Sequence, residues 1–368
     1  MRQRGRRRDR ICVVSSEPES IPEESESGEA ADDADVRHIL FRASKTQTRR
    51  IDQFLVDRVT YLSRANVQRL IDEGLVTVNG KGTKASYKIK AGDEVRMVAP
   101  PEPVNDLLPE PIPLEIIYED EHFLALNKQA DLIVHPARGK WSGTLVNGLV
   151  YYGKKWSTVN GNWRPGILHR LDRNTTGVML VAKSDEAHWR LARQFENRTI
   201  QKTYLAVIHG VPELLADVID LPIGKDKYVR EKQAVRKEEN GGRPAVTKYE
   251  IQEIFADPPG AVLRESEFPQ DRNAPAAKGR FALVELTPKT GRTHQLRVHM
   301  SAIGHPIVGD TMYGGRIFER GDFRLARQAL HAWRINFVHP ATLERMTLEA
   351  PLPGDLSDLV AILRGSSL

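Results

Sequence analysis

The sequence predicts an α+β protein of two domains, on the basis of three observations. Strand-like apolar runs and helical patterns are mixed along residues 114–368, without the regular strand–helix alternation that gives a parallel sheet. Residues 49–98 form a separate pattern of two short helices followed by small strands. Between them, residues 99–113 are rich in proline and acidic residues, which is the composition of a linker. The chain of 368 residues is long enough for both domains.

The first 48 residues are predicted to be a disordered tail. Residues 1–10 are a basic block, and residues 17–35 are rich in Glu and Asp and contain no Lys or Arg. Neither stretch has apolar periodicity, so neither can bury enough surface to offset the entropy lost on ordering. The basic block either contacts an RNA backbone or has no role of its own.

The composition is that of an ordinary globular protein with a cationic body. Apolar residues make up 40% and charged residues 28%, and the net charge of +5 includes the acidic run. The basic remainder suggests a polyanion such as RNA or DNA as partner, or serves only solubility. The single cysteine, Cys12, excludes a disulfide framework and a cysteine-rich zinc site and favours a reducing cytoplasm. No apolar run approaches the roughly 20 residues of a membrane helix, and no secretory signal is evident.

The segment 49–98 is predicted to contain two helices and a hairpin. Ser63 is the expected N-cap of the second helix, and Gly74 is its expected end. Asn79-Gly80 after the alternating run "LVTV" is a strong hairpin signal, and residues 92–98 are expected to form the closing strand. The apolar residues at helical spacing are Ile51, Phe54, Leu55 and Val59 in the first helix and Val67, Leu70 and Ile71 in the second.

This segment resembles the S4 RNA-binding domain. The resemblance rests on R-x-D-x-x-L at 50–55, on S-R-x-x-V-x-x-L-I-x-x-G-x-V-x-V-N-G at 63–80 and on G-D-x-V at 92–95. It covers nearly the whole segment and implies RNA as the partner. Four arginines on or beside the helices are candidates for phosphate contacts, although each alone is equally typical of a solvated helix face: Arg49, Arg50, Arg64 and Arg69.

The larger domain, residues 114–368, is predicted to have a sheet as its core. The expected strands are two runs on either side of a turn at 119–121, followed by 178–182, 203–209, 245–254 and 281–287. The expected helices are 144–152 and 185–197. Residues 256–279 are polar with several prolines, and we expect them to form an inserted loop.

The stretch "GILHRLDRNTTGVMLVAKS", residues 166–184, places four charged or titratable residues directly before an apolar run typical of a buried strand. One interpretation is a plain turn, in which Asp172 and its neighbours bond local backbone amides up to Gly177. A kinase catalytic loop is excluded because the Gly-rich phosphate loop, the V-A-I-K strand and D-F-G are all missing. A metal site that joins His169 to the histidines between 294 and 305 has no convincing ligand spacing.

The same stretch resembles the catalytic motif H-R-L-D-x-x-T-[ST]-G of the RluA/RluD-type pseudouridine synthases. Three further segments are similar to motifs of this family: "KTYLAVIHG" at 202–210, "TPKTGRTHQLRVHMSAIGHPIVGDTMYG" at 287–314 and "RQALHAWRINFVHP" at 327–340. With the S4-like segment, the resemblance covers about 300 of the 368 residues. It implies a mixed, largely antiparallel sheet with flanking helices.

One segment departs from the family pattern. "KQADLIVHPA" at 128–137 has Gln129 and Asp131 where the family's K-P-x-G-x-x-V-H-P has Pro and Gly. Pro fixes the backbone angle φ, whereas Gly permits conformations that other residues avoid. Without these two residues, the sequence leaves the conformation of this turn open.

The resemblance implies roles for the site residues. Asp172 matches the nucleophile, Arg297 the arginine that pairs with it, and Tyr204 the residue that stacks on the flipped base and helps to remove the C5 proton. Leu296 or Val298 is expected to pack against the base. The other residues expected to contact the RNA are Arg170, which matches the arginine that enters the helix stack when the base leaves it, and His169, Thr176, Arg292 and His294.

The residue types suit this chemistry. Converting uridine to pseudouridine breaks the N1–C1′ bond, turns the base and joins C5 to C1′. Nothing is oxidised and no group leaves, so we expect no cofactor and no metal. The reaction needs an ionised carboxylate, a cation that keeps it ionised in a dry pocket, and a flat wall for the base.

An S4-like module attached to such a domain resembles the rRNA-directed members, so 23S rRNA is the expected substrate. The alternatives are a tRNA substrate and a non-catalytic RNA-binding ribosome-assembly factor. The intact set of Asp172, Tyr204 and Arg297 argues against the second alternative. We expect a monomer that acts in the cytoplasm.

Overall fold

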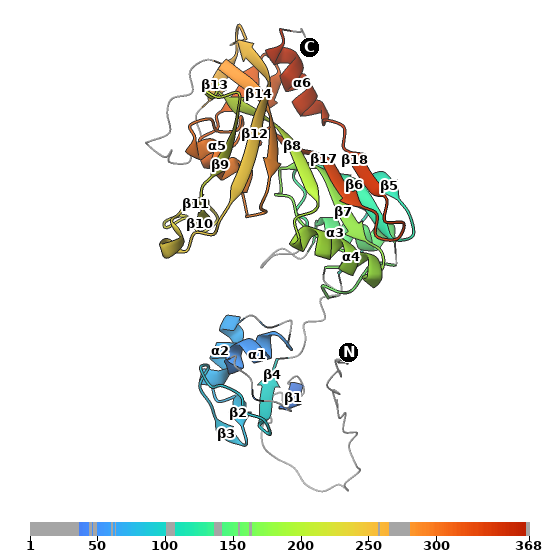
Figure 1. Ribbon diagram of the computed structural model, residues 1–368, viewed down its shortest axis with the longest axis vertical. Helices are drawn as coiled ribbons and strands as arrows, with labels where there is room; N and C mark the ends of the chain where they lie inside the picture. The colour runs from blue at the N-terminus through green and yellow to red at the C-terminus, as the bar shows by residue number, and fades with distance from the viewer. Residues whose placement is uncertain are drawn as a thin grey trace, which may run out of the picture. The chain divides into compact units, whose positions relative to one another are not determined.

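The computed structural model describes residues 37–43, 46, 50–59, 62, 64–100, 107–135, 142–153, 155–161, 164–256, 258–264 and 280–365. The chain divides into two compact units, residues 1–105 and 106–368, each with its own apolar core (Figure 1). Among the described residues, no helix is long and apolar enough to cross a membrane.

The first unit combines two helices with a four-stranded antiparallel sheet of order β1-β4-β2-β3. Its core gathers apolar side chains from both helices and from the sheet, including Ile51, Leu55, Val67 and Val95. The elements are β1 (Arg37–Arg42), α1 (Ile51–Val56), α2 (Arg64–Asp72), β2 (Val76–Val78), β3 (Lys81–Gly82) and β4 (Glu94–Ala99).

The predicted helices and hairpin of this unit are confirmed. Asn79 and Gly80 have φ angles of 52° and 77°, as a two-residue hairpin turn with two left-handed residues requires. Gly74, with φ at 76°, follows the end of α2. The expected N-cap Ser63 lies outside the described residues.

The prediction of a disordered tail was wrong for residues 37–42. These residues form β1, which pairs with β4 along its whole length, from Arg37 with Ala99 to Arg42 with Glu94. The edge of β4 supplies the hydrogen bonds that a local pattern in β1 could not predict, because strand pairing is a tertiary contact.

A sheet of nine strands forms the body of the second unit. Its order is β5-β6-β7-β17-β8-β14-β12-β9, and β18 pairs with β17 outside this path. The pair β7–β17 is parallel and the other pairs between its described strands are antiparallel, so the predicted mixed, largely antiparallel sheet is confirmed. The strands are β5 (Glu115–Glu119), β6 (Phe123–Lys128), β7 (Thr176–Ala182), β8 (Gln201–His209), β9 (Ala216–Asp220), β12 (Val246–Ala256), β14 (Arg280–Pro288), β17 (Leu330–Val338) and β18 (Arg345–Glu349).

Smaller elements surround this sheet. The hairpin β10–β11 projects from the body of the unit, and β13, β15 and β16 form a separate three-stranded sheet (Figure 1). These strands are β10 (Ile223–Lys225), β11 (Gln233–Val235), β13 (Val262–Arg264), β15 (Ile317–Arg320) and β16 (Phe323–Leu325). The helices are α3 (Leu145–Tyr152), α4 (Asp185–Glu196), α5 (Gln295–Ala302) and α6 (Gly354–Leu363), with short 3-10 turns at Glu238–Asn240 and Thr311–Tyr313.

The predicted strands and helices of this unit correspond to β5, β6, β7, β8, β12, β14, α3 and α4. Every residue of β6 and β7 is buried, which explains their nearly continuous apolar sequence. Helix α4 begins at Ser184, whose hydroxyl accepts the Ala187 N–H, and it buries the side of Ala187 and Leu191.

Two expected loops are shorter than predicted. The range 256–279 contains β13, which pairs with β15, while residues 257 and 265–279 lie outside the described part. In the expected linker, Ala99 ends β4, and residues 107–113 belong to the second unit. There the Glu110 N–H donates to the Asn147 carbonyl at 3.2 Å, and the Asn147 side chain donates to the Leu108 carbonyl at 3.0 Å.

Candidate active site

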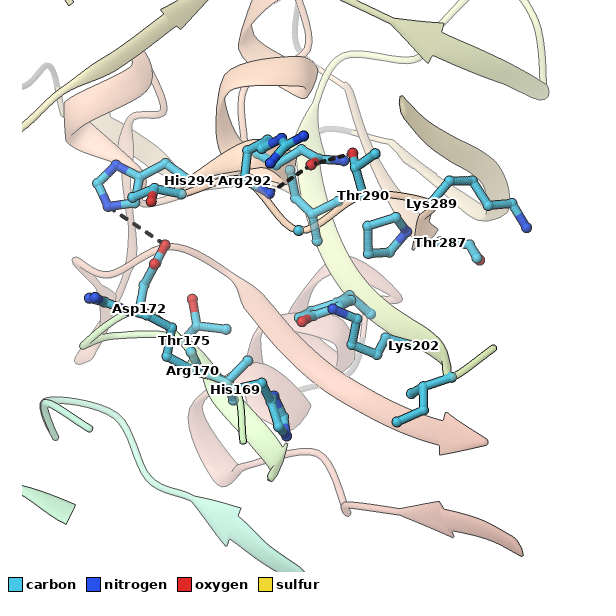
Figure 2. Close-up of a pocket in the computed structure, with 18 of the residues that line it drawn as sticks. His169, Arg170, Asp172, Thr175, Lys202, Thr287, Lys289, Thr290, Arg292 and His294 are labelled. Carbon is cyan, nitrogen blue, oxygen red and sulfur yellow. Dashed lines mark hydrogen bonds and ion pairs between the residues drawn. The ribbon is translucent and has the colours of Figure 1, made fainter. Parts of the chain in front are cut away.

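A cavity of about 790 Å³ lies where the turn before β7 meets β8, the end of β14 and the start of β17. The turn before β7, the first half of β8, the end of β14 and the start of α5 all contribute to it (Figure 2). It brings Asp172 and Tyr204 together with the adjacent residues Leu296 and Arg297, from three distant parts of the sequence. Its volume is within the range of small-ligand sites.

The turn that carries Asp172 is held by backbone and side-chain contacts. The backbone carbonyl of Asp172 accepts the Thr175 N–H at 3.1 Å, and the Leu132 N–H donates to the Arg173 carbonyl at 3.2 Å. The buried Lys128 ammonium also donates to the Arg173 carbonyl at 2.9 Å, and to the Gln129 and Leu132 carbonyls. Burial lowers the pKa of Lys128 to about 7, while the charge of Asp172 raises it. Lys128 therefore joins the turn of Asp172 to the neighbouring turn at 129–132.

That neighbouring turn is the one that departs from the family pattern. Asp131 has φ at 61°, in the left-handed region where the family pattern has glycine. Asp is one of the few residue types that enter this region at modest cost. Its carboxylate accepts a hydrogen bond from Arg173 Nε at 2.6 Å. The turn thus keeps a left-handed residue at this position, and the substituted side chain pairs with the residue after Asp172.

Arg297 is shared between two carboxylates. Its Nε and Nη2 donate to the two oxygens of Asp310 at 2.7 and 2.8 Å, and its Nη1 donates to Asp172 Oδ2 at 3.2 Å. Burial would lower the pKa of Arg297, but the hydrogen bonds and charge of Asp310, and then the charge of Asp172, raise it above its ordinary value. The guanidinium is therefore a fixed cation that faces the Asp172 carboxylate.

A second contact to Asp172 comes through His294. The Tyr313 hydroxyl accepts the Gln233 N–H at 2.9 Å and lies 2.7 Å from His294 Nδ1. We therefore assign the Tyr313 O–H as donor to His294 Nδ1, which leaves the ring proton of His294 on Nε2. That atom lies 3.9 Å from Asp172 Oδ2 (Figure 2). Burial lowers the pKa of His294 and the Asp172 charge raises it, with a net lowering, so the neutral ring directs an N–H towards the carboxylate.

Tyr204 and Leu296 form apolar walls of the cavity. Tyr204 lies on β8 between Ala332 and Leu286 of the neighbouring strands, and both it and Leu296 are buried. Burial, and next the Asp172 charge, raise the pKa of Tyr204. Its phenol is therefore protonated at neutral pH. Of the two expected base contacts at the start of α5, Leu296 lines the cavity, whereas Val298 packs with Ile223, Ala245 and Tyr313 in a separate cluster.

The remaining predicted residues of this unit differ in position. Arg170 is exposed at the edge of the cavity, and Arg292 lines it while donating through Nε to the Pro244 carbonyl. His169 lines the cavity, but its Nε2 accepts the Leu180 N–H at 3.0 Å. Burial, and next the charge of Lys202, lower the pKa of His169 to about 3, so it is a neutral acceptor.

Thr176, which was expected to contact the substrate, is not among the residues that line the cavity. Thr176 is buried, and its hydroxyl bonds His331 Nδ1 at 2.8 Å on the neighbouring strand β17. The preceding residue, Thr175, lines the cavity instead. Thr175 precedes β7, whereas Thr176 is its first residue and pairs with β17.

In the first unit, Arg50 and Arg64 both pair with the buried Asp52, at 3.1 and 3.0 Å. Burial would raise the pKa of Asp52, but hydrogen bonds from Gln68 and Arg64 lower it. Both arginines thus have a structural partner, and their side chains stay nearly half exposed. Arg69 is exposed and lies 3.7 Å from Glu73. Arg49 lies outside the described residues.

Sequence reasoning did not single out Asp310, Tyr313, Lys128 or Lys202. The segment "GDTMYG" at 309–314 carried a signal, because a buried Asp beside family motifs requires a cation. Lys202 lines the cavity two residues before Tyr204. Among the residues that the structure describes, no group of three or more His, Cys, Asp or Glu side chains is placed to hold a metal ion.

Comparison with known proteins shows the family of the chain. The family model for RNA pseudouridylate synthase matches residues 122–302, and the model for the S4 domain matches residues 49–95. The uncharacterized RNA pseudouridine synthase YlyB of Bacillus subtilis (strain 168) is 42% identical over 330 residues, covering 89% of this chain and 99% of that protein.

Two further relatives are similar over most of their length. The ribosomal large subunit pseudouridine synthase D of Neisseria meningitidis serogroup A is 37% identical over 323 residues, 86% of this chain and 79% of that protein. The solved structure of human RNA pseudouridylate synthase domain containing 1 is 26% identical, with a TM-score of 0.48, and covers 69% of this chain and 96% of that one. The chain therefore belongs to the RNA pseudouridine synthase family and carries an S4 domain before its catalytic domain.

Proposed function

We propose that this RNA pseudouridine synthase isomerises specific uridines of 23S rRNA, with Asp172 as the nucleophile. The observation that supports the nucleophile is the position of its carboxylate. Asp172 opens into the cavity, 3.2 Å from a guanidinium that Asp310 holds in place. Among the described residues that line the cavity, it is the one carboxylate. Because the guanidinium faces this carboxylate and offsets its negative charge, Asp172 is well suited to act as the nucleophile.

The neighbouring side chains fit the steps of the reaction. Leu296 and Tyr204 supply apolar walls for a uracil that has left its helix. Asp172 forms a bond to the nucleoside, the glycosidic bond N1–C1′ breaks, the base turns and C5 bonds to C1′. The bond to Asp172 breaks, the C5 proton leaves to solvent and N1 takes up a proton, so that the product is an isomer of uridine. Because the Tyr204 phenol is protonated before turnover, we assign it to stacking rather than to the first proton removal. Arg297 and the N–H of His294 offset the charge that returns to Asp172 when the product is released.

The target RNA is proposed from the relatives. The relative in Neisseria meningitidis is named for the large ribosomal subunit, and it spans 86% of this chain. Arg170 is exposed and lines the cavity, and we propose that it enters the RNA helix where the base leaves it. We also propose that the enzyme acts as a monomer in the cytoplasm.

The first experiment follows tritium release from 23S rRNA transcripts that contain uridine tritiated at C5. Asp172→Asn is expected to lose at least about a thousandfold in turnover while binding the transcript as the wild type does. The matched control is Asp322→Asn, at an exposed position in the turn between β15 and β16, and it is expected to keep wild-type turnover.

Each outcome distinguishes a part of the proposal. Turnover by Asp172→Asn would reject Asp172 as the nucleophile. Release from tRNA transcripts but not from 23S rRNA would replace the proposed substrate. Absence of release from both RNAs would contradict the catalytic proposal.

A further inference from the structure

Lys202 is a cation that faces the cavity without an anionic partner. It is the second residue of β8 and lines the same cavity as Tyr204. Its ammonium lies 5.8 Å from the centre of the Phe195 ring, and in the described part of the chain no carboxylate pairs with it. Burial lowers the pKa of Lys202. Such a half-buried ammonium is costly unless a ligand supplies the counter-charge.

The ammonium of Lys202 lies close to the loop that follows β14. A methyl group placed on Gly291 would lie 3.7 Å from Lys202 Nζ, so the ammonium faces this loop closely. In the view of Figure 2, Lys202, Thr287 and Lys289 lie on the side of the cavity away from Asp172 and His294. The cavity therefore has one end with the Asp172 carboxylate and another end with Lys202 and Lys289.

The charge of the cavity lining is strongly unbalanced. Its cations are Arg170, Arg198, Lys202, Lys289, Arg292 and Arg297, against the single carboxylate of Asp172 among the described lining residues. Arg297 is already engaged by Asp172 and Asp310. The remaining positive charge lies at both ends of the cavity: Figure 2 shows Arg170 near Asp172, and Lys202 and Lys289 at the opposite end, where the described residues provide neither lysine with an ion pair.

We propose that Lys202 binds the backbone phosphate next to the target uridine, at the end of the cavity opposite Asp172. This inference rests on the proposed function, because it takes RNA as the occupant of the cavity. Lys202 and Tyr204 are two residues apart on one strand, so their side chains leave the same face of the sheet, roughly 7 Å apart along it. A base stacked on Tyr204 would thus bring one of its own flanking phosphates to the ammonium.

The test is a cycle between the protein and the RNA. A synthetic stem-loop that spans the uridine mapped by tritium release is made in three forms: unmodified, and with a neutral methylphosphonate on the 5′ or the 3′ side of that uridine. Single-turnover rates and KM are measured for the wild type, Lys202→Met and Lys202→Arg. Lys248→Gln, an exposed lysine on β12 that pairs with Glu250 outside the cavity, is the matched control.

The expected result is a coupled loss at one phosphate. Neutralising that phosphate should lower kcat/KM of the wild type and of Lys248→Gln roughly ten- to hundredfold, and should have no further effect on Lys202→Met. Lys202→Met should also reduce the salt dependence of binding by about one phosphate contact. Lys202→Arg, which keeps the charge, should recover most of the loss.

Two results would overturn the inference. Equal losses for wild type and Lys202→Met at both phosphates, with normal turnover of the unmodified RNA, would reject the phosphate contact and leave the proposed function intact. No turnover of any 23S rRNA or tRNA transcript by the wild type would reject both. The two substitutions also separate phosphate binding from a structural role. If Lys202 were only structural, Lys202→Met could lose activity, but that loss would not depend on which phosphate of the RNA is neutral.

Discussion

The contact between Arg297 and Asp172 depends on a third residue. A guanidinium has a fixed planar fork, and Asp310 occupies its Nε and Nη2. This leaves Nη1 free to point at Asp172, so the direction of the cation is decided before any RNA binds. A lysine at this position would supply charge without this direction, because an ammonium rotates freely about its stem.

Asp310→Asn is expected to weaken both folding and catalysis. The variant removes the charge of one of the two carboxylates that pair with the buried guanidinium of Arg297, so the free energy of unfolding should fall by about 3 kcal/mol and turnover by roughly a hundredfold or more. Urea unfolding and single-turnover tritium release measure the two effects. Glu253→Gln, which breaks the more exposed pair with Arg364, should change the unfolding free energy by less than about 1 kcal/mol. Wild-type turnover in Asp310→Asn would contradict the proposed orienting role.

Asp131 tests the departure from the family pattern. Asp131→Gly removes the cost of a left-handed residue, about 1 kcal/mol, and also removes a surface ion pair of similar or smaller value. The unfolding free energy should therefore change by less than about 1 kcal/mol. Asp131→Val, which is β-branched, should destabilise by about 2 kcal/mol because its side chain resists this backbone conformation. Thermal unfolding measures the stability of both variants. Equal losses of stability would show that the left-handed conformation at residue 131 does not determine the effect.

Among the elements, the parallel pair β7–β17 positions the site. His331 is opposite Thr176 and Ala332 is opposite Gly177, directly after the turn that carries Asp172. Gly177 has φ at 115°, and a Cβ atom on it would lie 2.2 Å from the Ala332 carbonyl oxygen. The two strands therefore approach so closely only because this residue has no side chain.

Gly177→Ala is expected to separate β7 from β17 and to move the turn of Asp172. We expect a loss of at least about 3 kcal/mol in unfolding free energy and little or no turnover. The control is Gly321→Ala, in the turn between β15 and β16, where φ is also positive but no atom lies within 4 Å of the added Cβ. It should cost only about 1 kcal/mol. Equal losses of stability in the two variants would show that the positive φ requires glycine at residue 177, and that the close approach of β17 does not.

For the whole molecule, folding in two units means that each has its own stability. All five tryptophans lie between residues 141 and 333, so their fluorescence reports the second unit alone. Several histidines of that unit are buried and neutral. Burial is the first cause that lowers the pKa of His135 to about 4 and of His209 to about 4. Acid should therefore destabilise this unit well above the ordinary carboxylate range.

His209→Gln tests this acid sensitivity. His209 is buried, and its Nε2 accepts the Arg316 N–H at 3.0 Å. Between pH 6.5 and about 4 the unfolded chain binds a proton that the folded protein does not, so stability falls as the pH falls, by about 1.4 kcal/mol per unit for each such histidine. Urea unfolding followed by tryptophan fluorescence at pH 7.5 and 5.0 should differ by about 2 kcal/mol less in His209→Gln than in the wild type.

The matched control for this experiment is His38→Gln, an exposed residue of β1 in the other unit. In His38→Gln, the unfolding free energy measured by tryptophan fluorescence should change with pH as it does in the wild type. An unchanged pH response in His209→Gln would show that other groups cause the acid sensitivity.

The sequence by itself predicted most of the regular elements. The hairpin at Asn79-Gly80, the helix that follows Ser184 and the buried strand after Asp172 were predicted correctly, because apolar period and turn chemistry are local properties. Family motifs also selected Asp172, Tyr204 and Arg297, which the structure brings to one cavity.

Tertiary structure alone decided which partner each side chain has. Arg297 and Asp172 are 125 residues apart, and β1 needs the edge of β4. Local sequence did not predict that Thr176 turns away from the cavity while Thr175 faces it, or that Asp52 engages Arg50 and Arg64. The physical reason is that burial and pairing depend on atoms from distant segments, whereas conformational preference depends on near neighbours. The position of Lys202 depends on the tertiary structure for the same reason, because the fold brings it into the cavity of Asp172 without pairing it with a described carboxylate.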